Sequence, residues 1–240
     1  GLTGKDIKYL NLPADLIALE YNEIRLHVNK KSVRFKGNRP LAYTIDRKKL
    51  GQWQLKKLQK YNNIEIRTGL EVSGVGKNFV IVGGRKISCT YLVGADGFTS
   101  IVKRYLGIKS KSSVAIQYVV PTKNYKELEV FCNSKLFSSW YAWIFPHKGY
   151  ASIGCGCNPK ILSTEKLLAN FQIWLNKNKI DVARGKYEAF AVGCDYHGHH
   201  FNSVFLVGDA GGFASELTGE GIYSALVSGE EVAKIILNPK

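Results

Sequence analysis

The chain has 240 residues, of which 45% are hydrophobic and 22% charged, as in ordinary folded globular proteins. No apolar run approaches the roughly 18 residues that a membrane-spanning helix needs, and no signal peptide is visible, which favours a cytoplasmic protein. The formal net charge is +15, which suits solvated lysine-rich faces, an anionic substrate or a peripheral membrane contact, whereas the lack of a recognisable nucleic-acid module argues against a nucleic-acid partner.

The first part of the chain contains an alternating pattern and then a helical one. Residues 6–10 predict a short helix, and residues 16–36 predict two or three antiparallel strands because their apolar positions alternate. A longer helix is predicted over residues 47–61, since its leucines and tryptophan recur at roughly helical spacing and Asp46 is a suitable N-cap. Residues 63–67 then predict a short strand of the kind that follows a helix.

The middle of the chain favours small β-elements. Residues 70–75 and 78–82 predict a meander whose turn holds the following Gly-Gly pair. Residues 90–97, with the sequence TYLVGADG, predict a buried strand that runs into a glycine turn, and a helix through Arg104 follows. Two separate kinds of local structure, a β-meander and a strand–turn–helix, therefore lie next to each other in the chain.

The second half repeats this alternation. Residues 115–157 hold four strand-like segments, and residues 166–177 predict an amphipathic helix. After a basic, polar stretch, residues 204–207 predict another buried strand, which runs into a glycine-rich turn. A long helix is predicted from about Gly219 to Leu237. The order of elements indicates two interleaved domains of mixed α/β (α+β) class.

The cysteines indicate a reducing environment. There are five, an odd number, and no secretory signal accompanies them. Cys155 and Cys157 are two positions apart, so on a strand both side chains would point to one face. We expect them to pack in a core as small apolar residues, because no further metal ligands stand near them in the sequence.

The strongest chemical signal is the segment VFLVGDAGGFASELTGEGIYSALVSGEEVAK. Asp209 follows a strand, where a carboxylate can bond a sugar-like hydroxyl, and the glycines after it let backbone N–H groups approach a ligand. The helix that begins near Gly219 directs its partial positive charge to the same place. A reduced flavin carries negative charge on its pyrimidine ring and suits this arrangement.

This segment resembles the Gly-Asp flavin motif of the p-hydroxybenzoate hydroxylase superfamily of FAD enzymes. The segment YLVGADGFTSIVKRYLG resembles the same superfamily's Asp-Gly motif, which approaches both flavin and nicotinamide. The two stand in the superfamily's order, more than a hundred residues apart. The resemblance implies cofactor contacts from Asp96, Gly97, Gly208, Asp209, Gly219, Gly221 and Ile222.

A third segment is similar to a signature of one branch of that superfamily. Tyr141, Trp143, Phe145 and Pro146 resemble the Tyr-x-Trp-x-Phe-Pro strand of geranylgeranyl reductases, a family that includes digeranylgeranylglycerophospholipid reductases. In that family the strand lines the tunnel for an isoprenoid chain, so the resemblance implies that these four residues bind substrate. The family often has Pro three residues before the Tyr, where this chain has Ser138. Aromatic rings in this pattern also suit an apolar cavity on physical grounds.

The amino-terminal part resembles the same family. Gly1 looks like the end of its Cys-x-Gly-Gly-Leu segment, and Arg47 matches an arginine that opens a helix beside the cofactor; Val72 matches a backbone contact to the adenine end. The superfamily's opening strand and G-x-G-x-x-G turn have no counterpart here. The chain therefore reads as a fragment without the first βαβ unit, an expectation with which its lack of methionine agrees.

The resemblance implies a Rossmann-like FAD/NAD(P)-binding domain interleaved with an antiparallel β-sheet substrate domain. The expected FAD-binding domain comprises residues 1–15, 44–109 and 200–240, and the expected substrate domain comprises residues 16–43 and 110–199. The implied cofactor is FAD, reduced by NAD(P)H or ferredoxin. The implied reaction is hydride transfer from reduced FAD to a geranylgeranyl double bond of a diphosphate, lipid or pigment precursor.

Two other functions stay open at this point. A flavin monooxygenase or halogenase of the same fold would carry a similar aromatic strand, which in halogenases is Trp-x-Trp-x-Ile-Pro. A truncated flavoprotein fold could also serve as a non-catalytic binding module. The sequence identifies no catalytic residue: His147, after the Phe-Pro pair, is a candidate proton donor, but an exposed loop histidine is the more ordinary expectation.

Overall fold

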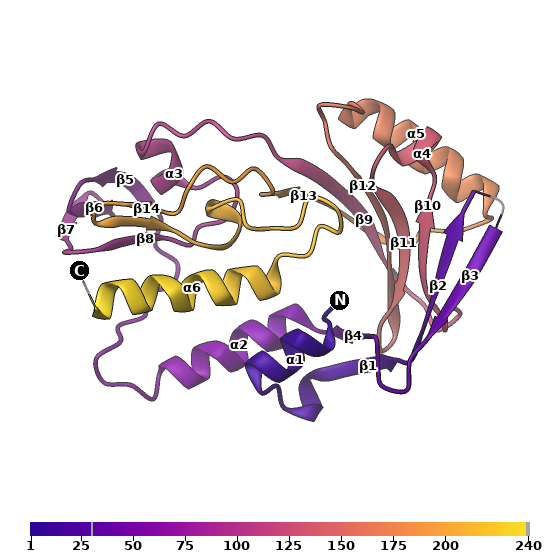
Figure 1. The fold of residues 1–240 in the computed structure, drawn as a ribbon, viewed down its shortest axis with the longest axis horizontal. Helices are drawn as coiled ribbons and strands as arrows, with labels where there is room; N and C mark the ends of the chain where they lie inside the picture. The colour runs from indigo at the N-terminus through magenta and orange to yellow at the C-terminus, as the bar shows by residue number, and fades with distance from the viewer. Residues whose placement is uncertain (30, 239–240) are drawn as a thin grey trace. The chain divides into compact units, whose positions relative to one another are not determined.

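The computed structural model describes residues 1–29 and 31–238, which form two compact units (Figure 1). Unit 1 comprises residues 1–61 and 114–190, and unit 2 comprises residues 62–113 and 191–240. Segments 1–15 and 44–61, which the sequence analysis assigned to the FAD-binding domain, pack with unit 1. Residues 239–240, where that expected domain ends, lie outside the described residues, as does Lys30 within the expected substrate domain.

Unit 1 is built on a seven-stranded sheet. Its strand order is β13-β9-β12-β11-β10-β2-β3. The strands are β2 (Glu23–Val28), β3 (Lys31–Lys36), β9 (Ser113–Pro121), β10 (Leu128–Cys132), β11 (Tyr141–Pro146), β12 (Tyr150–Cys157) and β13 (Lys186–Val192). Strands β10 and β11, β11 and β12, β12 and β9, and β2 and β3 pair antiparallel as expected, whereas β10 and β2 run parallel. Because β2 and β10 are far apart in sequence, no hairpin dictates their direction.

One face of this sheet carries the core of unit 1. Helices α4 (Ser134–Phe137) and α5 (Thr164–Lys177) lie against it (Figure 1). Phe171 and Trp174 of α5 pack there against inward-facing residues of the central strands, among them Ile153. Helix α5 is amphipathic, as its sequence pattern predicted, and its buried residues recur at helical spacing.

Further elements of unit 1 stand outside the seven-stranded sheet, namely α1 (Gly4–Leu10), the short 3-10 helix η1 (Ala14–Leu16), β1 (Ile17–Tyr21), β4 (Ala42–Ile45) and α2 (Arg47–Leu58). Strand β1 pairs antiparallel with β4, not with β2, although the sequence grouped residues 16–36 together. The Asp46 carboxylate accepts hydrogen bonds from the N–H groups of Lys48 and Lys49, which confirms the predicted N-cap.

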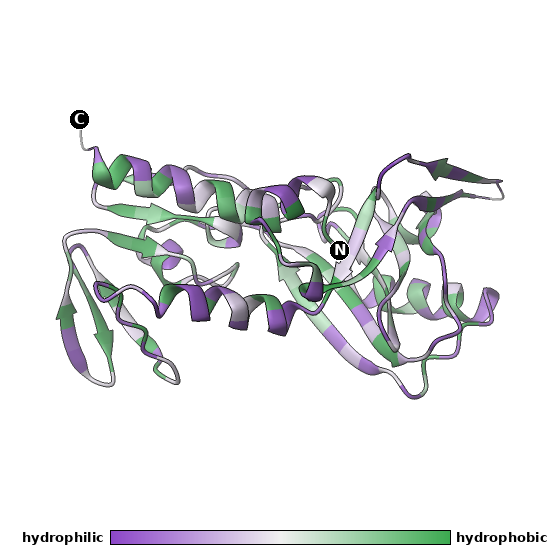
Figure 2. Ribbon diagram, turned by 90° about the horizontal axis from the view of Figure 1, so that it is seen from below, coloured by the Kyte–Doolittle hydropathy of each residue, from purple (hydrophilic) through white to green (hydrophobic). Residues whose placement is uncertain are grey.

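Unit 2 contains two three-stranded sheets. The first is the predicted meander of β5 (Val72–Gly76), β6 (Phe79–Val82) and β7 (Arg85–Ser88), with positive φ at both turn glycines. The second has the order β14-β15-β8, from strands β14 (His200–Phe201), β15 (Val204–Leu206) and β8 (Leu92–Gly94). Helices α3 (Ile101–Tyr105) and α6 (Ile222–Leu237) accompany them, and α6 shows alternating hydrophobic and hydrophilic surfaces in Figure 2.

Two local predictions are corrected by the structure. Residues 63–67 are not a strand, because an extended segment needs a paired neighbour and none runs beside it in the described residues. Residues 186–192, part of a stretch read as basic and polar, form edge strand β13, whose outward positions tolerate polar side chains. Among residues 1–29 and 31–238, no helix combines the length and apolar character that crossing a bilayer requires.

Candidate functional site

The two glycine-aspartate motifs lie side by side in unit 2. Strands β8 and β15 are adjacent and parallel, and the Val207 N–H donates to the Gly94 carbonyl oxygen at 3.0 Å. Asp96 and Asp209 therefore both follow the carboxyl ends of neighbouring parallel strands. In open α/β sheets this edge is where ligands bind.

Backbone groups pack closely around the turn that holds Asp209. Gly212 has a φ of +76°, and a Cβ atom there would lie 2.3 Å from the carbonyl oxygen of Asp195. The Gly193 N–H approaches Asp209 Oδ2 at 3.5 Å. Only glycine at 212 permits this approach, so the turn is held against residues 193–195, a segment that the sequence analysis did not connect with the motif.

Helix α6 begins directly beside Asp209. Its first residue is Ile222, and its N-cap Gly221 provides no side-chain cap. A Cβ atom at Gly221 would lie 3.1 Å from Asp209 Oδ1. Gly219, with a φ of +67°, stands in the preceding turn, so the helix begins three residues later than predicted because left-handed backbone cannot continue a right-handed helix. The helix has no acidic residue in its own first turn, and the Asp209 carboxylate lies beside its positive end.

Asp96 has a local structural role in this structure. Its Oδ2 accepts from the Ile101 N–H at 2.8 Å, and Ser100 Oγ accepts from the Lys103 N–H, so both side chains cap the start of α3. Gly97 adopts a φ of +75° between them. Val72, at the start of β5, is about a third exposed and pairs with Val82. The structure thus places Asp96 and Gly97 beside the Asp209 strand and Val72 in the separate meander.

Lys103 is a buried cation that the sequence did not indicate as a site residue. It is 6% exposed, and its Nζ lies 4.1 Å from the centroid of the Phe98 ring. Burial lowers the pKa of Lys103, while the carboxylates of Asp96, Asp195 and Asp209 act in the opposite direction. The ammonium group of Lys103 is therefore attracted to a carboxylate of each motif, Asp96 in one and Asp209 in the other. The sequence shows the Lys103-Arg104 pair within the Asp-Gly segment, but nothing in its pattern indicates that the Lys103 side chain is buried.

In unit 1, two expected cofactor residues lie near His147. The bridge between Leu2 and Tyr43 holds Gly1 next to the strand that leads into α2, where Arg47 is the first residue. Burial, with a smaller contribution from the Arg47 guanidinium, lowers the pKa of His147 to about 4, while Asp46 acts in the opposite direction. The exposed loop histidine expected from the sequence is therefore a partly buried neutral imidazole, and its Nδ1 is buried without a hydrogen-bond partner in the described structure.

The predicted substrate strand presents its aromatic rings on one face. Tyr141, Trp143 and Phe145 alternate along β11, with ring centroids 5.9 Å apart in the first pair and 6.0 Å in the second. The face opposite, with Ala142 and Ile144, belongs to the core under α5. Pro146 is buried, and its carbonyl oxygen accepts from the Tyr21 hydroxyl at 2.8 Å. The aromatic rings thus line the face of the sheet that α4 and α5 leave uncovered.

A chain of hydrogen bonds fixes the middle ring. Trp143 Nε1–H donates to Ser152 Oγ at 2.9 Å, and Ser152 Oγ donates to Gln117 Oε1 at 2.6 Å. Gln117 Nε2 donates in turn to Glu188 Oε2 at 3.0 Å. Lys186 and then Gln117, by hydrogen bonding, hold the pKa of Glu188 below its ordinary value. These polar residues were not found from the sequence, because they converge from three strands through pairing that no local pattern encodes.

Replacing Ser152 by alanine should destabilise unit 1 by about 1–3 kcal/mol, because the buried indole N–H would lose its acceptor. Urea unfolding followed by tryptophan fluorescence would measure the change. Ser134→Ala, at an exposed position in the same unit, is the matched control and should stay within about 0.5 kcal/mol of the parent. Equal effects of the two substitutions would contradict the role given to Ser152.

Cys155 and Cys157 lie in the core, as expected. Both are fully buried on β12, on the face that packs under α5. Burial raises the pKa of the Cys157 thiol to about 11 and that of Cys155 further, so neither is a thiolate at neutral pH. Across the described ranges, no group of three or more His, Cys, Asp or Glu side chains is arranged to hold a metal ion.

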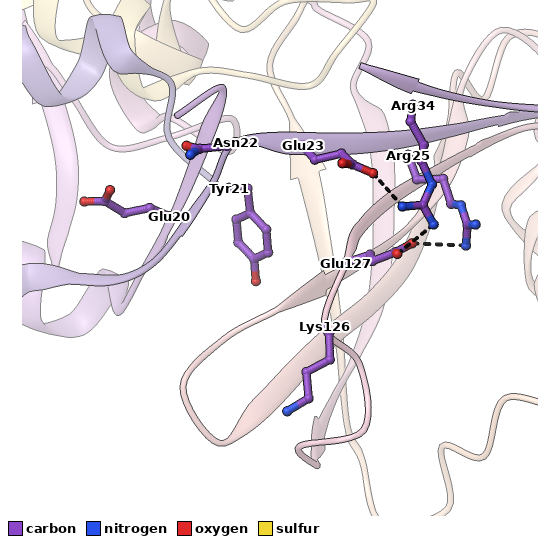
Figure 3. A pocket seen from close by; sticks show the side chains of 8 residues that line it. All are labelled: Glu20, Tyr21, Asn22, Glu23, Arg25, Arg34, Lys126 and Glu127. Atoms are coloured by element: carbon purple, nitrogen blue, oxygen red, sulfur yellow. Dashed lines mark hydrogen bonds and ion pairs between the residues drawn. The ribbon is translucent and has the colours of Figure 1, made fainter. Parts of the chain in front are cut away.

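One hollow of about 280 Å³ lies elsewhere in unit 1 (Figure 3). Its arginines are already engaged: Arg34 bonds Glu23 at 2.7 Å and Glu127 at 2.9 Å. It contains none of the expected site residues and is therefore not the candidate site. Its lining consists of Glu20, Tyr21, Asn22, Glu23, Arg25, Arg34, Lys126 and Glu127.

The residues around Asp209 in unit 2 are suited to holding a flavin. Glycine at 221 lets the start of α6 pass close to the Asp209 carboxylate, and the N-cap of α6 contributes no side-chain cap. Asp209 is suited to a ribityl-type hydroxyl, and the helix end is suited to an anionic group. In unit 1, the orphaned Nδ1 of His147 is a buried polar atom that a ligand would satisfy.

Comparisons with known proteins agree with this geometry. Residues 66–236 match the family model described as FAD binding domain. The chain is 28% identical over 239 residues to a digeranylgeranylglycerophospholipid reductase of Methanococcus vannielii, covering 87% of this chain and 59% of that protein. The crystal structure of a geranylgeranyl bacteriochlorophyll reductase-like protein from Thermoplasma acidophilum matches with a TM-score of 0.82 and 20% identity, covering 98% of this chain and 66% of that one.

Flavin enzymes of another activity share the fold. The flavin-dependent brominase Bmp2 matches with a TM-score of 0.74 and 14% identity, covering 98% of this chain and 68% of that one. The chain spans about three fifths of the length of the curated relatives that it matches, 63% and 59% for the first two. The predicted mixed α/β fold of an FAD-binding protein is confirmed by these matches.

Proposed function

This chain belongs to the family of FAD binding domains, and from that premise we propose that it is part of an FAD-dependent oxidoreductase that reduces isoprenoid carbon–carbon double bonds. The observation that carries the proposal is the aromatic row of β11, where Tyr141, Trp143 and Phe145 stand together on the face of the sheet opposite α5. The relative named digeranylgeranylglycerophospholipid reductase and the reductase-like solved structure support the same substrate class.

The proposed roles divide between the two units. Asp209, Gly221 and the first turn of α6 would hold FAD in unit 2, and Arg47 and Gly1 in unit 1 are further proposed contacts. Bound FAD supplies a hydride when reduced. The protein's part is to hold an apolar chain on a surface that excludes water, for which the aromatic row offers large and stiff contact area.

Reduction of a double bond also needs a proton on the second carbon, and we assign it to the Tyr141 hydroxyl. The assignment follows from the place of this hydroxyl in the aromatic row; burial, with a smaller contribution from Cys132, raises the pKa of Tyr141 to about 12, which leaves Oη protonated at neutral pH but a weaker acid than a free phenol. His147 is the poorer candidate: with a pKa of about 4 it carries no imidazolium proton at neutral pH. The thiol of Cys132, paired across the strands with Tyr141, lies on the same face.

A flavin-dependent halogenase or monooxygenase is the second candidate, favoured by the fold shared with the brominase. The aromatic strand distinguishes the two, since this chain has Tyr141 and Phe145-Pro146 where the halogenase pattern has Trp and Ile-Pro. A non-catalytic binding module is the third. Flavin absorbance of the purified protein separates it from both enzymes.

Anaerobic incubation of the flavin-reduced protein with a geranylgeranyl lipid should oxidise the flavin and add two hydrogens per double bond. Stopped-flow absorbance of the flavin and mass spectrometry of the lipid would follow the two events. A saturated phytanyl lipid is the matched control and should leave the flavin reduced. Flavin oxidation that requires oxygen or halide, without hydrogenation of the lipid, would instead establish the monooxygenase or halogenase.

A further inference from the structure

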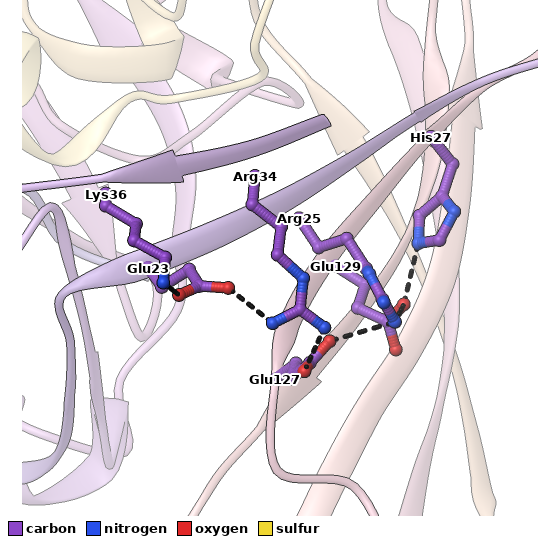
Figure 4. Close-up of polar contacts among 7 residues, drawn as sticks. All are labelled: Glu23, Arg25, His27, Arg34, Lys36, Glu127 and Glu129. Atoms are coloured by element: carbon purple, nitrogen blue, oxygen red, sulfur yellow. Dashed lines mark hydrogen bonds and ion pairs between the residues drawn. The ribbon is translucent and has the colours of Figure 1, made fainter. Parts of the chain in front are cut away.

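The hairpin of β2 and β3 has two chemically different faces. Side chains alternate along paired strands, so one face carries the charged residues (Figure 4). There Arg34 bonds Glu23 and Glu127 at 2.7 and 2.9 Å, and His27 approaches Glu129 at 2.7 Å. The charges on this face are largely paired with one another, which holds the hairpin to β10. The set is Glu23, Arg25, His27, Arg34, Lys36, Glu127 and Glu129.

The opposite face of the same hairpin is apolar and open. Val28, Val33 and Phe35 are 43%, 53% and 51% exposed. Lys31 pairs with Val28 and therefore shares their face at the end of the hairpin. Helices α4 and α5 cover the other side of the sheet, where the core of unit 1 lies. Both views place the hairpin at the periphery of unit 1, and Figure 2 shows its alternation of hydropathy.

The open face continues into the aromatic strand. One cross-strand row runs from Val33 through Leu26 and Val130 to Trp143. A second row runs from Lys31 through Val28 and Cys132 to Tyr141. The rows therefore join the open hairpin to the aromatic strand through the half-buried side chains of Leu26, Val130 and Cys132, and the Trp143 ring at the end of the first row is buried.

The charge around the hairpin indicates what covers this face. Strand β3, at the edge of the sheet, carries Lys31, Arg34 and Lys36, and the whole chain has a net charge of +15. A second copy of the chain would bring the same positive charge against itself, and lysines on an edge strand oppose strand-to-strand association. An anionic lipid surface matches both properties, because apolar side chains enter the interface while cations remain among the headgroups.

We propose that the apolar face of the β2–β3 hairpin docks on an anionic lipid bilayer, with Val28, Val33 and Phe35 in the interface and Lys31 at the headgroups. Docking itself does not depend on flavin chemistry. Passage of a lipid along the rows to Tyr141 and Trp143 rests in addition on the proposed function.

The test is sedimentation of the flavin-loaded protein with vesicles of phosphatidylcholine, with and without phosphatidylglycerol. We expect binding to the anionic vesicles that weakens with salt. Val33→Ser with Phe35→Ser should weaken it roughly tenfold or more, since a large apolar contact is lost. Ile161→Ser, at a 65% exposed position of the same unit, is the matched control and should bind like the parent. Lys31→Glu should reduce binding to anionic vesicles only.

Three results would overturn the proposal. The parent protein could fail to bind anionic vesicles, or the double variant could bind like the parent while its circular dichroism shows it folded. Light scattering could instead reveal a dimer that the double variant abolishes, which would assign the face to a second copy. These lipids contain no isoprenoid chain, so failure here leaves the reductase assay unaffected, and failure of that assay leaves docking unaffected.

Discussion

Valine in place of Gly221 should weaken FAD binding by roughly 10- to 100-fold. A Cβ atom at this position would lie 3.1 Å from Asp209 Oδ1 and 3.3 Å from Ala214 Cβ, and the larger branched side chain would displace the carboxylate and crowd the first turn of α6. Loss of one hydrogen bond to a charged group, at about 1.5–3 kcal/mol, corresponds to that change in Kd. Titration of the flavin-free protein with FAD, followed by flavin fluorescence, would measure it.

Gly229→Ala is the matched control for this prediction. Gly229 lies in the same helix, with nothing within 4 Å of an added Cβ, so alanine should stabilise α6 by up to about 1 kcal/mol and leave the Kd for FAD unchanged. If the valine variant fails to fold, Asp209→Asn, which keeps the shape of the side chain, tests the same turn and should also weaken FAD binding. A folded Gly221→Val protein with parental affinity would exclude this turn from the flavin site.

Removal of the Tyr141 hydroxyl should reduce kcat for isoprenoid reduction by about 10²- to 10⁴-fold, the range of a lost general acid. Tyr141→Phe keeps the ring, its packing against Trp143 and the apolar face, so FAD affinity and KM should change little. Because the pKa of Tyr141 is raised to about 12, the parent's rate should show no fall caused by this group until the pH approaches that value. Single-turnover flavin oxidation across pH would record both effects.

Tyr187→Phe provides the comparison, since it removes a phenol from the same sheet at a 44% exposed position, and it should retain parental kcat. Cys132→Ser distinguishes the neighbouring thiol: if the proton comes from Cys132, this variant will lose activity while Tyr141→Phe keeps it. Parental kcat in Tyr141→Phe would remove the proton-donor role and leave the residue a purely apolar contact.

Local chemistry in the sequence was enough for many of the elements. The N-cap at Asp46, the positive-φ Gly83 and Gly84 turn and the amphipathic α5 each depend on residues a few positions apart, so their patterns predict them directly. The Gly-Asp and Asp-Gly segments likewise indicated a flavin fold, because both resemble motifs of the p-hydroxybenzoate hydroxylase superfamily and stand in that superfamily's order. The family match to residues 66–236 confirmed that inference.

Only the tertiary structure decided which distant groups meet. It paired β8 with β15, made β2 parallel to β10 and left residues 63–67 without a partner. Burial of Lys103 beside the carboxylates of both motifs also depended on packing.

The bonds from Trp143 to Ser152 and on to Gln117 depended on strand register in the same way. Strand pairing and burial are relations between segments far apart in the chain, and the free energy that selects them comes from the whole packed unit. Propensity and spacing act over one or two turns of chain, so they predict the elements and the motifs but not the neighbours that give those motifs their chemistry.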